Sequence, residues 1–405
     1  MSVRQFVRNG PLWRVIAAEG VSVAGDWVLI TAASIHVFRE TSSTFAVSAL
    51  LALAAAPTIL LAPLGGTMAD RHDRARLMVL SDAIIAAVLL AGTALAGGML
   101  SLAIAYAAVL AAAASAAFHR PASEALLPSL TAPGELGRAN SVLRLASRIA
   151  MIGGPALAGF LMSGNGFAVV MAFDAGTFLI SAGLMVTLIG RRAPSPVEAH
   201  ESALRAALAG WDYTRRRREI AVVTAAIAVT MVMGAIISAG TLAFVSEELD
   251  LPESRYGALL AVEGAGAVAL AVAFILIGPR LNLLLTGTAA LVATGAACAS
   301  LGLAPSLAWA MGIMAVMGMG EVGLQVAFSS YLQQQSDDAF RGRVMSLVGM
   351  MAALGRLAGL AMAGPAVDFA GAPAAFAVAG LVIMVSALPV AGLAVSSGRR
   401  MPARA

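Results

Sequence analysis

The sequence has no lysine, one cysteine and few charged residues of either sign. Cys298 stands alone in an apolar run, which excludes a disulfide framework and a zinc site built on cysteines. Charged residues make up 12% of the chain, whereas soluble domains contain roughly 25%. Hydrophobic residues make up 60% of its 405 residues, and the mean hydropathy is +0.88. Because no soluble fold can bury so much apolar surface, the composition predicts an integral membrane protein.

Catalytic and nucleotide-binding motifs are also missing. Neither an H-E-x-x-H motif nor a Walker phosphate loop occurs, and His36, His72, His119 and His200 are scattered along the chain. A G-x-G-x-x-G pattern at 318–323 lies inside an apolar run, where the strand–turn–helix unit that binds a dinucleotide cannot form. We therefore predict no enzyme activity, no nucleotide, no cofactor and no metal site.

Long apolar runs dominate the remaining sequence. A helix needs ~20 apolar residues to cross a bilayer, and the chain contains twelve such runs. The predicted spans are 15–38, 45–69, 77–98, 100–118, 141–163, 166–190, 220–245, 257–278, 281–302, 307–330, 344–366 and 370–395. The first run is too long for a signal-peptide core and lacks a small-residue cleavage site, so we expect a retained helix.

The arginines predict the orientation of these spans. With the N-terminus in the cytoplasm, 22 of the 26 arginines lie in inner loops and tails, and only Arg39 and Arg255 lie in outer loops. Arg148 and Arg356 fall within helices. Both termini are therefore predicted to be cytoplasmic. The basic pI of about 9.9 then reflects this loop asymmetry, and we predict no nucleic-acid partner.

A charged interruption divides the chain in two. Residues 191–218 form a predicted cytoplasmic linker between an N-terminal six-helix half, 1–190, and a C-terminal six-helix half, 219–405. The four arginines at 215–218 are interpreted as an anchor for the seventh span, with binding of anionic lipid headgroups as the weaker alternative.

The two halves also share a weak repeat. A shift of 205 residues aligns the fifth span with the eleventh, which is typical of transporters built from parallel repeats. The coinciding pairs are Gly137/Gly342, Arg138/Arg343, Ser141/Ser346, Gly154/Gly359, Ala158/Ala363 and Gly159/Gly364.

The strongest motif is GGTMADRHDRAR, which follows the second span at 65–76. Its glycines would let helices approach, its acid could cap a helix, and its arginines would hold the cytoplasmic face. The motif resembles the G-x-x-x-D-R-x-G-R-R loop of the major facilitator superfamily. The matching residues are Gly66, Asp70, Arg71 and Arg74, whereas Asp73 stands where that pattern has glycine, and Arg76 lies one place beyond its final basic position.

Other stretches narrow the resemblance. FHRPASEALLP at 118–128, ELGRANS at 135–141 and RGRV at 341–344 are similar to the exporter branch that includes enterobactin-type siderophore exporters and macrolide-efflux-like proteins. The resemblance covers essentially all twelve spans. It implies a two-half fold that rocks around a midplane site and transports outward. The substrate varies within the branch.

Two signatures of the antiporters bear on coupling. GGPALAG at 153–159 looks like the G-P-x-x-G-G signature at Gly154, Pro155 and Gly159, although Ala158 replaces one glycine. Ordinary packing of small residues explains this stretch equally well. The arginine that drug antiporters often carry in the fourth helix is absent from the predicted span at 100–118.

Acidic residues within the spans are candidates for proton coupling, because a charge at mid-bilayer costs at least ~2.5–3.5 kcal/mol. Glu19 and Asp26 lie seven residues apart on the first span. This spacing puts them within ~20° of one helix face and ~10 Å apart. We predict that both face the cavity and exchange protons; the alternatives are a water-exposed Glu19 and a structural, hydrogen-bonded Asp26. Asp82 and Asp174, on spans expected to be peripheral, are interpreted as structural.

Two deep acids lie in the second half. The resemblance implies that the tenth helix lines the cavity, which makes Glu321 a candidate for contact with substrate or proton. Glu263 stands where the branch usually has a small residue, and is a candidate for substrate specificity. Its alternative role is an ion pair with Arg148 or Arg356, which are themselves predicted to form intramembrane ion pairs.

The sequence therefore predicts an all-α polytopic membrane protein of twelve transmembrane helices in two pseudo-symmetric halves. We expect it in the bacterial inner membrane, surrounded by lipid, where it exports a drug, siderophore or secondary metabolite in exchange for protons. Asp70, Arg71 and Arg74 would latch the outward-open state. Nutrient uptake and lysophospholipid flipping stay as alternatives on the same fold, and a non-transport membrane enzyme or receptor-like scaffold is a remote one.

Overall fold

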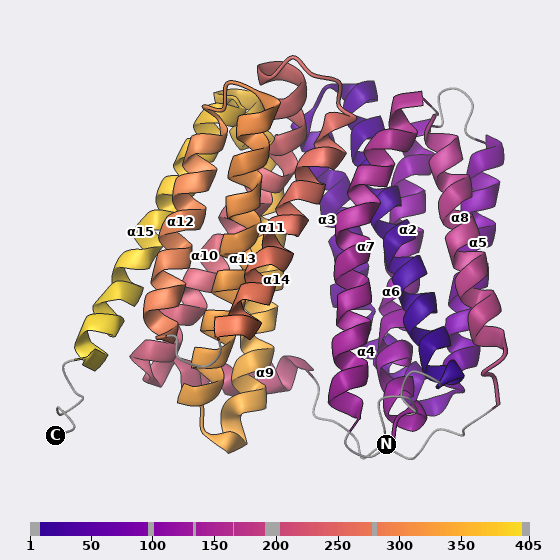
Figure 1. Cartoon of the computed structure of the whole chain (residues 1–405), viewed down its shortest axis with the longest axis horizontal. Helices are drawn as coiled ribbons and strands as arrows, with labels where there is room; N and C mark the ends of the chain where they lie inside the picture. Colours follow the sequence, from indigo (N-terminus) through magenta and orange to yellow (C-terminus); the bar gives the residue numbers. More distant parts are fainter. Residues whose placement is uncertain are drawn as a thin grey trace. The chain divides into compact units, whose positions relative to one another are not determined.

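The computed structural model describes residues 9–95, 101–132, 135–164, 166–190, 203–277 and 282–398. The predicted N-terminal arm, the first part of the linker and Arg280 lie outside these residues, as does the chain after 398. The described elements are helices: α2 (Gly10–Thr41), α3 (Thr44–Leu60), α4 (Ala62–Arg71), α5 (Arg74–Leu95), α6 (Ser101–Leu130), α7 (Leu136–Gly164), α8 (Phe167–Val186), α9 (Ala203–Arg216), α10 (Arg218–Ala243), the π-helical turn η1 (Phe244–Glu248), α11 (Arg255–Ile277), α12 (Leu283–Leu301), α13 (Leu307–Gln335), α14 (Asp338–Ala370) and α15 (Ala372–Gly398) (Figure 1).

Eleven helices in the described part are long and apolar enough to cross a membrane. A shorter apolar stretch, Thr44–Thr58, belongs to α3. The predicted second span, 45–69, is covered by α3 and α4, which are separated by the single residue Leu61 and linked by hydrogen bonds from Leu61 to Pro57 and from Gly65 to Leu61; α4 has a proline in its first turn. A proline has no backbone N–H to continue the helical ladder. The all-helical membrane fold is confirmed, and the predicted count of twelve spans is approximate.

The fourth predicted span is too short. It ends at 118, whereas α6 continues to Leu130 with Pro121 and Pro128 inside it. Pro121 cannot donate to the carbonyl of Ala117, four residues earlier. Gly65 of α4 packs directly against that carbonyl oxygen, where any β-carbon would overlap it. The neighbouring helix therefore covers the site of the missing hydrogen bond, and the helix carries His119 and Arg120 within it.

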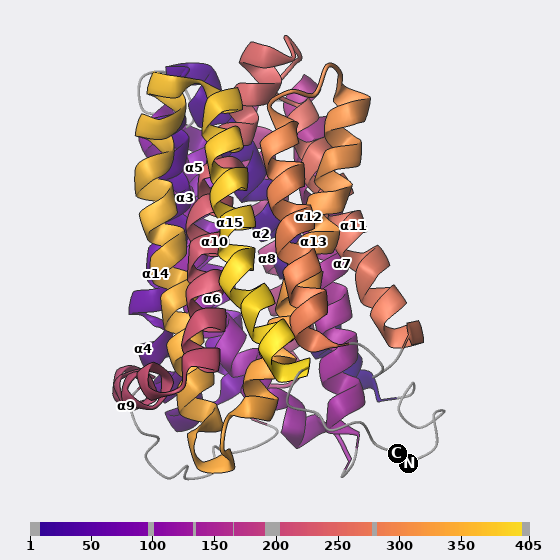
Figure 2. The same ribbon diagram turned by 90° about the vertical axis from the view of Figure 1, so that its left-hand side faces the viewer.

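The chain forms two compact units. The first unit contains Met1–Ser42, Leu50–His200 and Glu253–Ala261, and the second contains Ser43–Ala49, Glu201–Pro252 and Val262–Ala405. In the first unit, α2 packs on α7 and α8, and α5 packs on α8 and α6. In the second unit, α10 packs on α14 and α15, and α12 packs on α15 and α13. Helices at equivalent positions in the two units thus pack against equivalent neighbours, as expected of a repeat (Figures 1 and 2).

Close glycine contacts follow the 205-residue repeat. Gly154 of α7 packs against α2, and its counterpart Gly359 of α14 packs against α10. Gly159 lies against the residues at the start of α11, and its counterpart Gly364 lies against those at the start of α3. At each of these positions a β-carbon would overlap its neighbour. The repeat seen in the sequence therefore preserves helix-to-helix contacts in both units.

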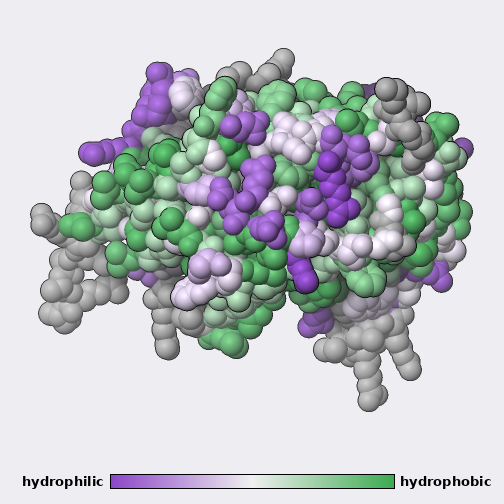
Figure 3. Space-filling view, turned by 90° about the horizontal axis from the view of Figure 1, so that it is seen from above, coloured by the Kyte–Doolittle hydropathy of each residue, from purple (hydrophilic) through white to green (hydrophobic). Residues whose placement is uncertain are grey.

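Outward-facing side chains are largely apolar. Phe369 is 92% exposed and Leu276 80% exposed, which suits contact with lipid tails rather than water. Figure 3 shows hydrophobic residues along the outer edge of the visible end, with hydrophilic residues gathered on the end face.

Buried charge is distributed unevenly between the units. Among the described residues, the acidic and basic side chains that are buried are Glu19, Asp82, His119 and Asp174, and all four belong to the first unit. The buried polar side chains described in the second unit are threonines and serines. The first unit therefore holds the chemistry that needs closer inspection.

Candidate functional site

The buried charged residues of the first unit gather where α2, α5, α6 and α8 meet. Glu19 on α2 is only 5% exposed. Asp26, two turns further along α2, is half-buried, and its Oδ1 atom is buried with no hydrogen-bond partner. The prediction that both acids face a cavity stays a prediction. Their neighbours come from α6, which carries His119, and from α8, which carries Asp174.

His119 of α6 lies between acids from two other helices. Its Nδ1 atom is 2.9 Å from Oδ1 of Asp82 on α5, a hydrogen bond that is fully buried. Its Nε2 atom is 3.4 Å from Oε2 of Glu19 on α2. That second contact is within ion-pair distance but does not satisfy hydrogen-bond geometry, so both atoms lack a hydrogen-bond partner. Oδ2 of Asp82 also lacks one.

A second carboxyl group lies near Asp26. Asp174 of α8 is fully buried, and its Oδ1 accepts a hydrogen bond of 2.9 Å from the hydroxyl of Thr177. Both of these oxygens fill the space beside Gly25 of α2, where a β-carbon would overlap them. Asp174 interacts electrostatically with Asp26, and its Oδ2 has no hydrogen-bond partner.

The cluster contains more acids than bases. The four carboxyl groups of Glu19, Asp26, Asp82 and Asp174 are accompanied by His119 and by Arg120, an exposed residue that interacts electrostatically with Glu19 and Asp26. Buried unpaired charges cost several kcal/mol each. With both bases charged, the group is neutral only when two of the carboxyl groups carry protons. Such a cluster can take up and release protons as its surroundings change.

The sequence interpretation missed three members of this cluster. The sequence predicts a structural role for Asp82 and Asp174, and it shows His119 only as one of four scattered histidines. Because the fourth span is predicted to end at 118, the prediction does not place His119 on a helix. When α6 is continued through Pro121, Ser115, His119 and Ser123 follow at intervals of four residues on one buried face.

The two candidate acids of the second unit, Glu263 and Glu321, form no ion pair with a described residue. Glu263 on α11 is half-buried, and its backbone carbonyl packs against Gly318 of α13. It interacts electrostatically with Glu321, which is exposed on α13. In the described residues, the ion pairs do not include one between Glu263 and Arg356, which is itself exposed on α14. Their predicted cavity roles stay predictions.

Arg148 on α7 is half-buried, and its guanidinium lies 3.8 Å from the sulfur of Met151. The predicted role of Arg148 in an intramembrane ion pair stays a prediction.

The loop motif at 65–76 ties three helices together. Arg74 donates to the carbonyl of Ala69 at the end of α4 and to that of Ala125 on α6, at 3.2 and 3.0 Å. Asp73 caps α5 by accepting from the backbone N–H of Arg76, and its other oxygen accepts from the backbone N–H of Gly190. The residue that departs from the family pattern is thus a helix cap.

The remaining motif residues have different surroundings. Gly66 lies in open space, whereas Gly65 makes the close contact with α6. Asp70 is half-buried and Arg71 is exposed, and their predicted latch role stays a prediction.

The antiporter-like stretch is a packing surface. Gly154 lies against Trp27 of α2, and the carbonyl of Pro155 lies against Gly257 at the start of α11. Gly159 faces the same segment of α11. These small residues let backbones approach closely, so the geometry explains their spacing without assigning them a role in coupling.

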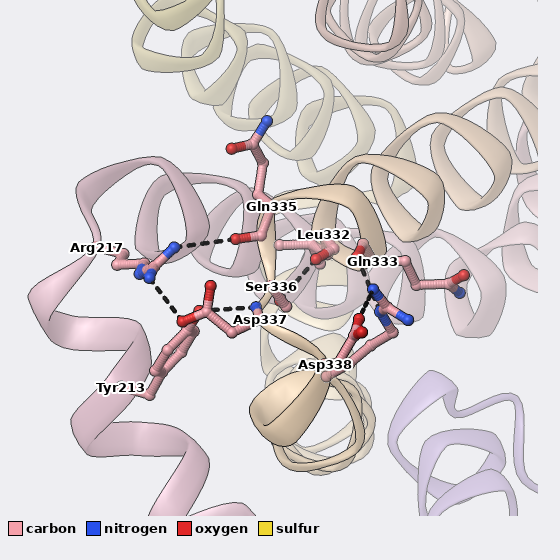
Figure 4. A network of polar contacts seen from close by, with 9 residues as sticks. Tyr213, Arg217, Leu332, Gln333, Gln335, Ser336, Asp337 and Asp338 are labelled. Atoms are coloured by element: carbon pink, nitrogen blue, oxygen red, sulfur yellow. Dashed lines mark hydrogen bonds and ion pairs between the residues drawn. The ribbon is translucent and has the colours of Figure 1, made fainter.

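A polar network in the second unit joins α9 to the loop between α13 and α14 (Figure 4). Arg217 donates to the carbonyl of Gln335 at 3.2 Å and to a carboxylate oxygen of Asp337 at 2.8 Å. The hydroxyl of Tyr213 accepts from the backbone N–H of Asp337 at 3.0 Å, and its ring stacks on Phe340 at 4.5 Å. The predicted linker, 191–218, therefore contains a helix that is anchored to the second unit.

Comparisons with known proteins agree with this architecture. An uncharacterised MFS-type transporter, YfiS of Bacillus subtilis (strain 168), is 25% identical, with 98% of this chain and 96% of that protein aligned. The multidrug efflux pump Tap of Mycolicibacterium fortuitum is 26% identical over 91% of this chain and 92% of its own.

Solved structures share the fold. A bacterial homologue of the iron transporter ferroportin, in an inward-facing state, superposes with a TM-score of 0.69 at 17% identity and covers 96% of this chain and 100% of its own. The peptide transporter POT in complex with sulfate superposes with a TM-score of 0.72 at 15% identity. The match covers 96% of this chain and 95% of the POT chain. The profile of the Major Facilitator Superfamily matches residues 15–360. The chain is therefore a multi-pass membrane protein that belongs to the Major Facilitator Superfamily of transporters.

Proposed function

We propose that this transporter exports amphiphilic small molecules from the bacterial cytoplasm across the inner membrane, by alternating access and in exchange for protons. The observation that carries the proposal is the charged cluster of the first unit, in which buried Glu19, Asp82, Asp174 and His119 lie with half-buried Asp26 and exposed Arg120. Relatives along nearly the whole chain include a multidrug efflux pump, which supports the outward direction.

Proton exchange through this cluster would alter the preference between conformations. A charged carboxylate is costly to enclose in an apolar interior, whereas a protonated one is not. Proton binding would therefore favour the state in which the carboxyl group is enclosed, and proton release would favour the state in which it meets water. Asp26 is the first choice for the exchanging group, because one of its oxygens is buried without a hydrogen-bond partner while the residue as a whole is only partly buried.

The test is a tolerance and accumulation panel in a pump-deficient bacterial host. It compares the wild type with Asp26→Asn, with and without a protonophore, at equal membrane expression. We expect the wild type to lower accumulation of at least one compound. The protonophore should abolish that effect, and Asp26→Asn should reduce export on the order of tenfold or more. Asp250→Asn serves as the control, because Asp250 is exposed in a loop with a left-handed backbone that asparagine tolerates.

Other results would redirect the proposal. If Asp26→Asn exports as well as the wild type, Asp26 is structural and the coupling group is another of the candidate acids, Glu19, Glu321 or Glu263. If the wild type exports no compound, the result favours nutrient uptake or lipid flipping over export. An envelope defect after deletion of the gene would then favour lipid flipping.

A further inference from the structure

His119 occupies the centre of the cluster and differs in chemistry from its neighbours. It is 4% exposed, so water does not reach the ring freely. Of the groups around it, only an imidazole can be neutral or charged near neutral pH without a large perturbation. A histidine between two acids can either be a permanent cation that neutralises them or a group that passes protons.

The charged groups around His119 come from several helices. Asp82 on α5 binds Nδ1, and Glu19 on α2 faces Nε2. Arg120 is the next residue on α6, and Asp26 on α2 interacts electrostatically with His119. Asp174 on α8 interacts with Asp26 rather than with the ring. α4 and α7 also pack on α6. Within the described residues, these two helices add no acidic or basic side chain to the hydrogen bonds and ion pairs of His119.

The two ring nitrogens have unequal partners. We assign the proton of this hydrogen bond to Nδ1, with the Asp82 carboxylate as acceptor. The bond then fixes the ring, and Nδ1 keeps its proton in either charge state of the ring. Nε2 is then free to act as acceptor or donor, and it lies 3.4 Å from Oε2 of Glu19 with no hydrogen-bond partner. A movement of a few tenths of an ångström would bring the pair to ordinary hydrogen-bond length, ~2.7–3.2 Å.

We propose that His119 is a proton-relay residue, which accepts a proton at Nε2 from Glu19 and returns it, while Asp82 is the positioning residue that holds the ring. In the forward step the O–H bond of the Glu19 carboxyl breaks and an N–H bond forms at Nε2, which leaves a carboxylate and an imidazolium. The reverse step restores both neutral groups. The proposal rests on the proposed function, since a relay is needed only where protons drive transport.

The first experiment observes the ring directly and needs no cargo. The chain contains four histidines, so nitrogen-15 labelling of histidine in lipid nanodiscs gives few signals, and His119→Asn identifies those of His119. We expect Nδ1 to stay protonated while Nε2 gains and loses a proton across the pH range in which the protein stays folded. Asp26→Asn should shift this transition, because it removes a neighbouring negative charge. A ring that stays in one charge state throughout this range would overturn the relay.

The second experiment separates movement of cargo from movement of protons. Purified variants in proteoliposomes are tested with ethidium, first for exchange across the membrane without a gradient and then for accumulation driven by a pH difference. For His119→Asn, whose amide can keep the bond to Asp82, we expect exchange within about twofold of wild type and driven accumulation lower by on the order of tenfold or more. His36→Asn is the matched control, because His36 lies on α2 outside the cluster and stacks on Phe167 at 5.0 Å.

The outcomes are distinct. Full driven accumulation by His119→Asn, or its recovery in His119→Arg, which cannot release a proton, would show that His119 is only a fixed cation. Loss of exchange together with driven accumulation would show a structural role. If the wild type itself does not move ethidium, the proposed function fails for this probe, while the titration of the ring in nanodiscs still decides whether His119 can relay protons.

Discussion

Adjacent glycines in the loop motif have opposite surroundings. Gly65 lies against the carbonyl of Ala117 on α6, at the point where Pro121 cannot complete the helical ladder. Gly66, the residue that matches the family pattern, has no neighbour that a β-carbon would meet. The structural constraint at this position therefore acts on Gly65 rather than on Gly66.

This difference can be measured. We expect Gly65→Ala to lower the free energy of unfolding by about 1–3 kcal/mol, the usual range for an overpacked site, because the opposing atom belongs to the backbone and cannot rotate away. Gly66→Ala is the control and should leave stability unchanged or slightly raised, since alanine is the better helix former. Unfolding in mixed detergent, followed by circular dichroism, gives both values. Equal stability of the two variants would contradict the proposed contact.

Single residues of the site were only partly predictable. Helical spacing places Glu19 and Asp26 on one face, because both lie in a long uninterrupted helix. Asp82 and His119 are 37 residues apart in sequence and join only through tertiary packing. The spacing of residues within one helix cannot show such a pair. Pro121 and Pro128 suggest that the helix ends near residue 118, whereas in the structure α6 packs on its neighbours and continues to Leu130.

At the scale of elements, α9 is the helix that the sequence interpretation did not contain. It lies crosswise to the long helices of the second unit (Figures 1 and 2). Gly210 packs against the backbone of α14, while Trp211 is 51% exposed. A search for long apolar runs finds spans but cannot find an amphipathic surface helix, which has too few apolar residues.

The anchoring of α9 leads to a prediction about local stability. Arg217→Ala removes the contacts to Gln335, Asp337 and the ring of Tyr213. The ion pair is exposed, so its share of global stability is small, about 1 kcal/mol or less. We expect faster hydrogen exchange of the α9 backbone with little change in the long helices.

Hydrogen exchange with mass spectrometry measures this difference for each peptide. Arg216→Ala is the matched control, because Arg216 is a neighbouring arginine that faces outward. Unchanged exchange in α9 for both variants would mean that the network does not hold the helix in place.

At the scale of the whole molecule, the two units repeat their packing but not their buried chemistry. Buried ionisable acids and the buried histidine belong to the first unit in the described residues, whereas Glu263 and Glu321 in the second are less enclosed. We therefore expect Glu263→Gln to change which compounds are exported while leaving their export sensitive to a protonophore.

The same accumulation panel measures this effect. A change of about threefold or more in the relative export of two cargoes would correspond to ~0.7 kcal/mol or more of altered discrimination. Glu248→Gln is the control, since Glu248 is exposed in η1 at the very end of the span that begins at Arg218. Loss of protonophore sensitivity in Glu263→Gln would instead place the coupling group in the second unit.

The equivalent contacts of Gly159 and Gly364 bear on how the two halves evolved. Two halves that keep equivalent contacts over a shift of 205 residues are what duplication of one ancestral gene leaves behind. After duplication, one copy is enough to retain the ion chemistry. Under the proposed function, the other copy is then released from that constraint, so a lineage can acquire new cargoes through mutations in one half without losing its energy source.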